Sequence, residues 1–210
     1  AVNDAPVCPD VTATITEDIS GSVSLACTDV DTGDSIEIEI VALNLTGVSG
    51  PVPGLVTAPV PLNPALNHEG SGGSFTYQAT DTALAVSGTG TATISVTAVN
   101  DAPVCSDLSV TLTEDTPDVA VLPCSDPDAG DTIAIEIVAL SLTGVSGPLV
   151  GPVTGPVPLV PDLNYNGSGG SFTYFATDII GAVSGTSTAS IDVTAVNDAP
   201  VCPDVTATIT

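Results

Sequence analysis

The sequence predicts an all-β protein built from β-sandwich domains that follow one another in tandem. The octapeptide AVNDAPVC begins at Ala1, Ala98 and Ala195, so the chain holds two repeats of 97 residues and the start of a third. Segments with a clear pattern alternate apolar and polar residues, which is typical of half-buried strands. Gly and Pro separate these segments, and no sustained 3.6-residue pattern indicates a helix. About seven short strands per repeat fit a two-sheet sandwich around one core.

The repeats predict the domain boundaries. We expect a first domain at residues 1–99, a second at 100–196, and the first strand of a truncated third domain at 197–210. Residues 1–16 are identical to 195–210, whereas the middle copy continues differently as VCSDLSVTLT. The larger period is therefore a pair of repeats, which predicts that the chain is part of a longer array. The proline of each octapeptide favours an extended, stiff connector between domains.

The composition restricts the partners. Twenty-five Asp and Glu residues stand against no Lys and no Arg, so the protein can form no Lys or Arg salt bridge. Nucleic acid is excluded as a partner because no basic residue can meet a phosphate, and an anionic membrane surface would repel the chain. No apolar run approaches the roughly 18 residues that span a bilayer, so we expect no membrane insertion of this segment. Metal ions, salt or a cationic partner must neutralise the charge.

The first elements of each repeat predict a disulfide. Residues 11–15 alternate as a strand, residues 16–21 have turn chemistry, and residues 22–27 are predicted to return as the second strand of a hairpin. Cys8 and Cys27 flank this turn almost symmetrically, and Cys105 and Cys124 have the same separation. We therefore expect the pairs Cys8–Cys27 and Cys105–Cys124, with Cys202 left over. The alternative is five buried free thiols. Disulfides would indicate an oxidising, extracellular compartment.

An acidic loop follows in both repeats. The first reads TDVDTGD from Thr28 and precedes an alternating strand at residues 36–40, and the second reads SDPDAGD from Ser125. Three carboxylates in six residues form an oxygen-ligand cluster that suits a hard cation. An EF-hand fits poorly, because the glycine stands at the fifth position and the twelfth is Ile40 or Ile137. The alternative is that Asp and Gly occur here simply because they favour turns. The recurrence of the loop, in a chain without basic residues, argues against this alternative.

The rest of each repeat carries strands. Residues 41–73 and 138–170 are rich in Pro and Gly and predict short strands at edges or bulges. Strands at 74–79 and 91–99 should place Phe75, Tyr77 and Ile94 on a buried face, and the second repeat has the same pattern. His68, replaced by Tyr165 in the second repeat, is interpreted as a surface residue. The glycosylation sequons at Asn44 and Asn166 do not recur, which favours unmodified asparagine.

The ordered set VNDAP, TED, DxDxGD, NxxGSGGSFTYxATD and TAxIxVTAVND resembles the cadherin-like, immunoglobulin-like tandem repeats of large bacterial and archaeal surface proteins and adhesins. The resemblance covers nearly the whole chain. It implies calcium at the junctions between domains. The implied ligands at the central junction are Glu17, Asn100, Asp101, Asp126, Asp128, Asp131 and Asp178. The implied N-terminal set is Asn3, Asp4, Asp29, Asp31, Asp34 and Asp81, and the implied C-terminal set is Glu114, Asn197 and Asp198.

Three classes of function compete. We expect a structural, calcium-stiffened segment of an extracellular surface fibre, filament or adhesin stalk, whose partners are further copies of the repeat. The alternative is a module that binds a surface glycan or protein, although three Tyr, three Phe and no Trp leave few stacking platforms. An enzyme is least expected, because the single His is not repeated and no nucleophile stands beside a base in the sequence.

Overall fold

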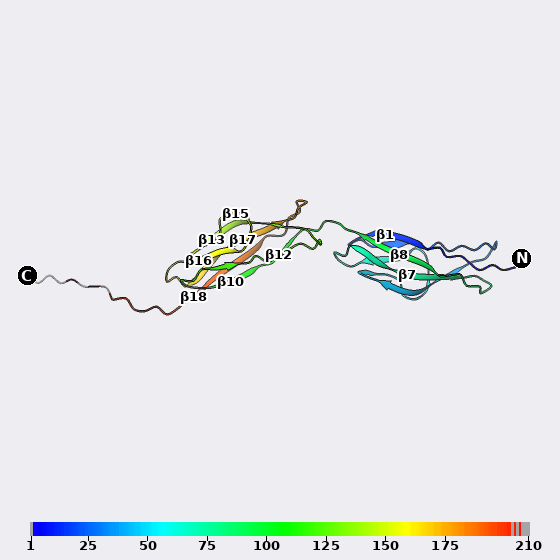
Figure 1. Cartoon of the computed structure of the whole chain (residues 1–210), viewed down its shortest axis with the longest axis horizontal. Helices are drawn as coiled ribbons and strands as arrows, with labels where there is room; N and C mark the ends of the chain where they lie inside the picture. Colours follow the sequence, from blue (N-terminus) through cyan, green and yellow to red (C-terminus); the bar gives the residue numbers. More distant parts are fainter. Residues whose placement is uncertain (1, 203, 205, 207–210) are drawn as a thin grey trace, which may run out of the picture. The chain divides into compact units, whose positions relative to one another are not determined.

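The computed structural model describes residues 2–202, 204 and 206, and all its regular elements are β-strands (Figure 1). The chain divides into two compact units, Ala1–Asn100 and Asp101–Thr210. The prediction of all-β sandwich repeats is confirmed. The predicted first strand of a third domain, within 197–210, falls largely on residues outside those described. Among the described residues, none forms a helix with the length and apolar character that crossing a membrane would require.

The first unit is a sandwich of a five-stranded and a three-stranded sheet. The large sheet has the order β1-β8-β7-β3-β5 and the small sheet the order β2-β6-β4. Strand β1 runs parallel to β8, whereas the other pairs in the unit are antiparallel. The strands are β1 (Val11–Thr16), β2 (Gly21–Val23), β3 (Glu37–Leu45), β4 (Val48–Ser49), β5 (Gly54–Val56), β6 (Val60–Pro64), β7 (Gly70–Thr80) and β8 (Gly90–Thr97).

The second unit repeats this arrangement. Its large sheet has the order β10-β18-β17-β13-β15 and its small sheet the order β11-β16-β14. Strands β12 and β9 form a separate two-stranded sheet. The strands are β9 (Val104–Cys105), β10 (Leu108–Thr113), β11 (Asp118–Ala120), β12 (Cys124–Ser125), β13 (Ala134–Leu142), β14 (Val145–Ser146), β15 (Gly151–Val153), β16 (Val157–Pro161), β17 (Gly167–Thr177) and β18 (Ser187–Thr194).

The core of each unit lies between its two sheets and follows the alternation in the sequence. In β7, Phe75, Tyr77 and Ala79 are fully buried, and the intervening residues are half-buried. The facing residues from the small sheet include Val60 and Leu62. The equivalent core of the second unit contains Phe172, Tyr174 and Leu159. Period-two alternation therefore predicted the buried face of the central strands correctly.

The structure corrects the predicted hairpin at the start of each repeat. Strand β1 pairs with β8, whereas β2 pairs with β6 in the opposite sheet, so residues 17–20 carry the chain across the sandwich. Near the cysteines, an isolated antiparallel bridge joins Val7 to Thr28. The structure joins Cys8 to Cys27 and Cys105 to Cys124, the predicted pairs, and Cys202 is free and exposed. Alternation indicates which face is buried, but it does not indicate which strand is the neighbour.

A buried tyrosine secures the segment before the first strand. The Tyr174 hydroxyl donates a hydrogen bond to the backbone carbonyl of Ser106, and the Tyr77 hydroxyl donates to that of Pro9. Burial raises the pKa of both phenols. We expect Tyr174→Phe to lower the free energy of unfolding by about 1 to 2 kcal/mol, because the carbonyl loses its partner while the ring still fills the core. Chemical denaturation would measure this, and no change would show that water replaces the hydroxyl.

Candidate metal centres

Each unit carries an acidic loop whose backbone is fixed by its own carboxylates. In the first unit, Asp29 Oδ1 accepts the N–H of Asp31 at 2.8 Å, and Asp31 Oδ2 accepts the N–H of Asp4 at 2.7 Å. The second unit repeats both bonds. Asp126 Oδ1 accepts the N–H of Asp128 at 2.9 Å, and Asp128 Oδ2 accepts the N–H of Asp101 at 2.7 Å. The Asp-x-Asp spacing therefore ties the acidic loop to the start of its own unit.

A second loop, directly after β7 or β17, brings a nearly buried aspartate to the same end of each unit. Asp81 is 4% exposed; its Oδ2 accepts the side-chain amide of Asn3 at 2.9 Å, and its Oδ1 accepts the N–H of Ala85 at 2.8 Å. The Asn3 amide, helped by backbone N–H groups, lowers the pKa of Asp81. Asp178 Oδ1 accepts three successive N–H groups, those of residues 180–182, at 2.6 to 2.9 Å. These hydrogen bonds hold both carboxylates at defined positions.

In the first unit the two loops together supply a group of carboxylates, and in the second unit the acidic loop alone supplies one. Oxygens of Asp29, Asp34 and Asp81 lie within 4.8 Å of one another in the first unit, and those of Asp126, Asp128 and Asp131 do so in the second. Burial, followed by repulsion from Asp126, Asp128 and Asp178, raises the pKa of Asp131. Such a group of oxygens repels itself unless a proton or a cation is bound. Carboxylate oxygens this close together could hold a hard divalent ion.

Two buried oxygens in these clusters have no hydrogen-bond partner among the described residues. They are Oδ2 of Asp29 and Oδ2 of Asp126, the equivalent atoms of the two acidic loops. Burying a carboxylate oxygen without a partner is unfavourable. A cation bound in each unit would satisfy the unpartnered atom there, so the residues present fit the calcium that the resemblance implies.

Glu17 and Glu114 lie at the opposite end of their units from the acidic loops. Each directly follows β1 or β10, which runs parallel to the last strand of its unit, β8 or β18, so each glutamate lies where that last strand ends. Glu17 is 1% exposed and Glu114 is 3% exposed. Each accepts, through Oε1, the N–H of the residue that leaves the unit, Val99 or Val196. Each therefore fixes the direction in which the chain leaves its own unit.

Of the two predicted terminal sets of ligands, the structure gathers the N-terminal one but not the C-terminal one. The predicted residues that the first unit gathers at its N-terminal end are Asn3, Asp4, Asp29, Asp31, Asp34 and Asp81. Asp198 is exposed and belongs to no carboxylate group among the described residues, and Asn197 beside it donates only to the Asp198 carbonyl. Sequence reasoning missed Thr82, whose hydroxyl donates to Asp34 Oδ1 at 2.9 Å. Its counterpart is Ile179, so the repeat offered no signal for it.

His68 is a packing residue. Its ring lies over Gly47, where an added Cβ would come within 2.2 Å of it, and Tyr165 covers Gly144 in the same way. His68 is half-buried, with Nε2 3.2 Å from the Ser71 carbonyl oxygen. The surface position that we predicted is therefore partly covered, and the residue has a structural contact.

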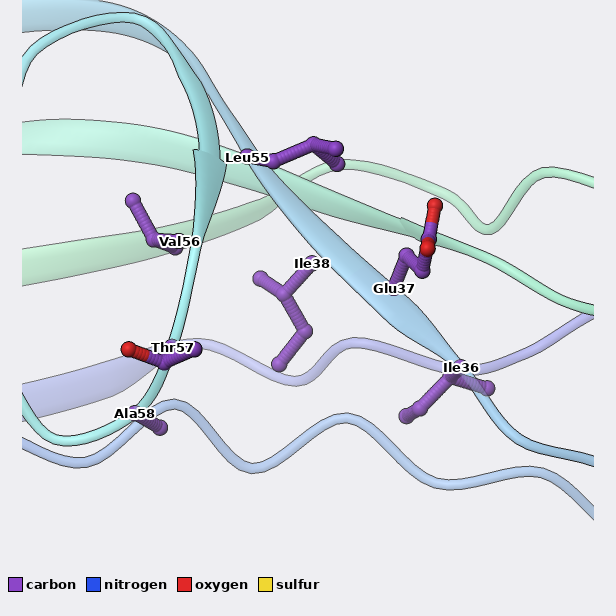
Figure 2. Close-up of a pocket in the computed structure, with 7 residues that line it drawn as sticks. All are labelled: Ile36, Glu37, Ile38, Leu55, Val56, Thr57 and Ala58. Carbon is purple, nitrogen blue, oxygen red and sulfur yellow. The ribbon is translucent and has the colours of Figure 1, made fainter.

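An open groove lies beside the edge strand of the large sheet in each unit. In the first unit it has a volume of about 560 Å³, and Figure 2 shows its lining, with Ile38 and Val56 among apolar neighbours and Glu37 pointing away from both. The equivalent groove of the second unit, beside Ile135 and Val153, has about 510 Å³. Neither lining contains a nucleophile paired with a base, so the grooves do not have the features of a catalytic site.

The comparisons with known proteins concern the fold. A family model described as bacterial Ig domain matches residues 3–97 and again 100–194. A crystal structure of mouse cadherin-23 EC22-24 is similar, with 20% identity and a TM-score of 0.54 over 91% of this chain. A crystal structure of human protocadherin-24 EC1-2 is similar over 94% of this chain and 100% of that one, with 20% identity and a TM-score of 0.53. This chain spans 65% of the cadherin-23 fragment. No curated protein matches the chain.

Proposed function

This chain belongs to the bacterial Ig domain family, and from that premise we propose that it is a structural, calcium-stiffened segment of an extracellular surface fibre, filament or adhesin stalk. Such repeats point to a structural or adhesive module of a surface protein, and such domains are typically not enzymes. The two disulfides support an extracellular location, because they persist in oxidising compartments. The partners in this proposal are further copies of the repeat in a long chain.

The observation that carries the proposal is that each unit holds a carboxylate cluster at its acidic loop, built from partly different positions of the repeat. Both units place three carboxylates within 4.8 Å of one another, and both bury one unpartnered oxygen, on Asp29 and on Asp126. The chain has no Lys or Arg to neutralise them. Calcium takes six to eight oxygen ligands from carboxylates, carbonyls and water in flexible geometry, which suits these loops. A catalytic site is rarely copied in every domain, whereas a mechanical joint has to be.

We further propose that calcium joins consecutive domains through the set Glu17, Asn100, Asp101, Asp126, Asp128, Asp131 and Asp178. The connector supports this assignment. The N–H of Val99 is bonded to Glu17 of the first unit, the N–H of Asp101 is bonded to Asp128 of the second, and one residue separates them in the chain. The terminal sets would be Asn3, Asp4, Asp29, Asp31, Asp34 and Asp81 at one end, and Glu114, Asn197 and Asp198 at the other.

Calcium binding tests the proposal directly. Titration calorimetry should detect binding to the 210-residue protein, and Asp128→Asn should weaken binding at one class of site by roughly tenfold or more. The asparagine keeps an oxygen acceptor for the N–H of Asp101, so the loss would report the missing charge. Asp162→Asn is the matched control, because it removes the same charge from an exposed turn. Equal affinity in the two variants would contradict the assignment of Asp128.

The stiffening is tested separately by small-angle scattering with calcium and then with a chelator. We expect the chelator to change the maximum dimension and increase the flexibility of the protein, while circular dichroism shows that both sandwiches stay folded. An unchanged scattering profile, together with no heat of calcium binding, would mean that the acidic loops are only solvated turns.

A further inference from the structure

One edge of each large sheet is long, unpaired and uncharged. Strand β1 stands at the end of the sheet order, as β10 does in the second unit, and no further strand pairs with either among the described residues. The opposite edge is formed by β5 or β15, each of three residues, and β15 includes Pro152. Short strands and proline protect a sheet edge from pairing with another chain. The six-residue β1 and β10 contain neither proline nor charge.

The unused backbone groups of β1 can be identified from its pairing with β8. Glu17, directly after β1, donates its N–H to the carbonyl of Thr97. Because backbone groups that face one neighbour recur at every second residue, the N–H and C=O groups of Thr12 and Thr14 face the open edge. In the second unit, Glu114 donates to the carbonyl of Thr194. The same reasoning places the groups of Ser109 and Thr111 at the open edge there.

These edges are self-complementary. Residues 11–15 read VTATI and residues 108–112 read LSVTL, each symmetric in residue type about its central residue. When two copies of β1 pair antiparallel about Ala13, Thr12 lies opposite Thr14 of the second copy, and all four free backbone groups of these residues are used. The same register places the half-buried Val11 opposite the buried Ile15 of the second copy, so the exposed part of Val11 gains an apolar neighbour.

Charge also favours a second copy in this register. The protein has a formal net charge of −25, so most contacts between two copies would oppose carboxylates. Pairing about Ala13 places the nearest carboxylate, Asp10, opposite Thr16 rather than opposite another acid. We propose that β1 and β10 are lateral docking edges, at which a second copy of this chain pairs its own β1 or β10 in an antiparallel, two-fold arrangement. Lateral association of this kind is separate from the calcium sites.

The test is self-association measured by sedimentation equilibrium, at high salt to screen the net charge and with chelator to exclude the calcium sites. We expect the unmodified protein to associate reversibly. The variant with Thr12→Asp, Thr14→Asp, Ser109→Asp and Thr111→Asp should have an apparent dissociation constant roughly tenfold higher or more, because carboxylates then face each other across the edge. Continued association at the original strength would overturn the proposal, as would an unmodified protein that stays monomeric at every concentration.

Two further variants control for charge and test the register. Thr93→Asp, Ser95→Asp, Thr188→Asp and Ser190→Asp add the same charge one strand inward, on β8 and β18, and should leave association unchanged. Thr12→Lys with Thr14→Asp, and Ser109→Lys with Thr111→Asp, should associate at least as strongly as the unmodified protein. The antiparallel register places each lysine opposite an aspartate, whereas parallel pairing would place like charges together. Loss of association in this last variant would overturn the register.

Discussion

Replacing Gly170 with alanine is expected to lower the stability of the second unit by about 3 kcal/mol or more. Gly170 lies at an irregularity in the pairing of β17, with a φ of +85° that side chains rarely adopt. An added Cβ would lie 1.9 Å from the carbonyl oxygen of Ser141, and the adjacent atoms on β13 are also backbone. A rotamer change cannot relieve this contact, so the strands have to separate locally.

Differential scanning calorimetry would measure the effect. The transition of the second unit should move to lower temperature, and that of the first unit should stay in place. Gly185→Ala is the matched control in the same unit, because no atom lies within 4 Å of its added Cβ and its φ is not positive. A Gly170→Ala protein within 1 kcal/mol of this control, on the order of the ordinary scatter of surface substitutions, would contradict the expected backbone clash.

Removing the disulfide of one unit is the second large effect that we expect. Cys105 and Cys124 are 19 residues apart, and a loop of this length contributes about 3 kcal/mol through the restricted entropy of the unfolded chain. Cys105→Ala with Cys124→Ala should therefore lower the unfolding midpoint of the second unit by roughly 12 to 24 °C. The intact Cys8–Cys27 unit in the same molecule provides an internal reference.

The corresponding double substitution at Cys8 and Cys27 should exchange the roles of the two units. Both variants should keep their β-sheet circular dichroism at low temperature, because each core stays buried without the bond. A midpoint that does not move would show that the native contacts around the cysteines, rather than the crosslink, restrict this segment.

The sequence by itself determined the repeat, the fold class and the position of the acidic loops. The alternation in β7 and β17 predicted which side chains are buried, since successive residues of a strand point to opposite faces whatever the neighbour is. The cysteine pairs also followed from the sequence, because their spacing recurs in both repeats. Repetition made these features visible without a three-dimensional structure.

Only the tertiary structure decided which strands are neighbours. It showed that β1 joins β8 and that β2 belongs to the other sheet, so that β1 has an open edge. It brings a carboxylate oxygen of Asp81 within 4.8 Å of one of Asp29, 52 residues away in the sequence, although the resemblance had already implied that the two belong to one set. Alternation along a strand is a local property, whereas pairing depends on how two sheets enclose one core. The partners therefore depend on contacts between distant residues, which no local pattern records.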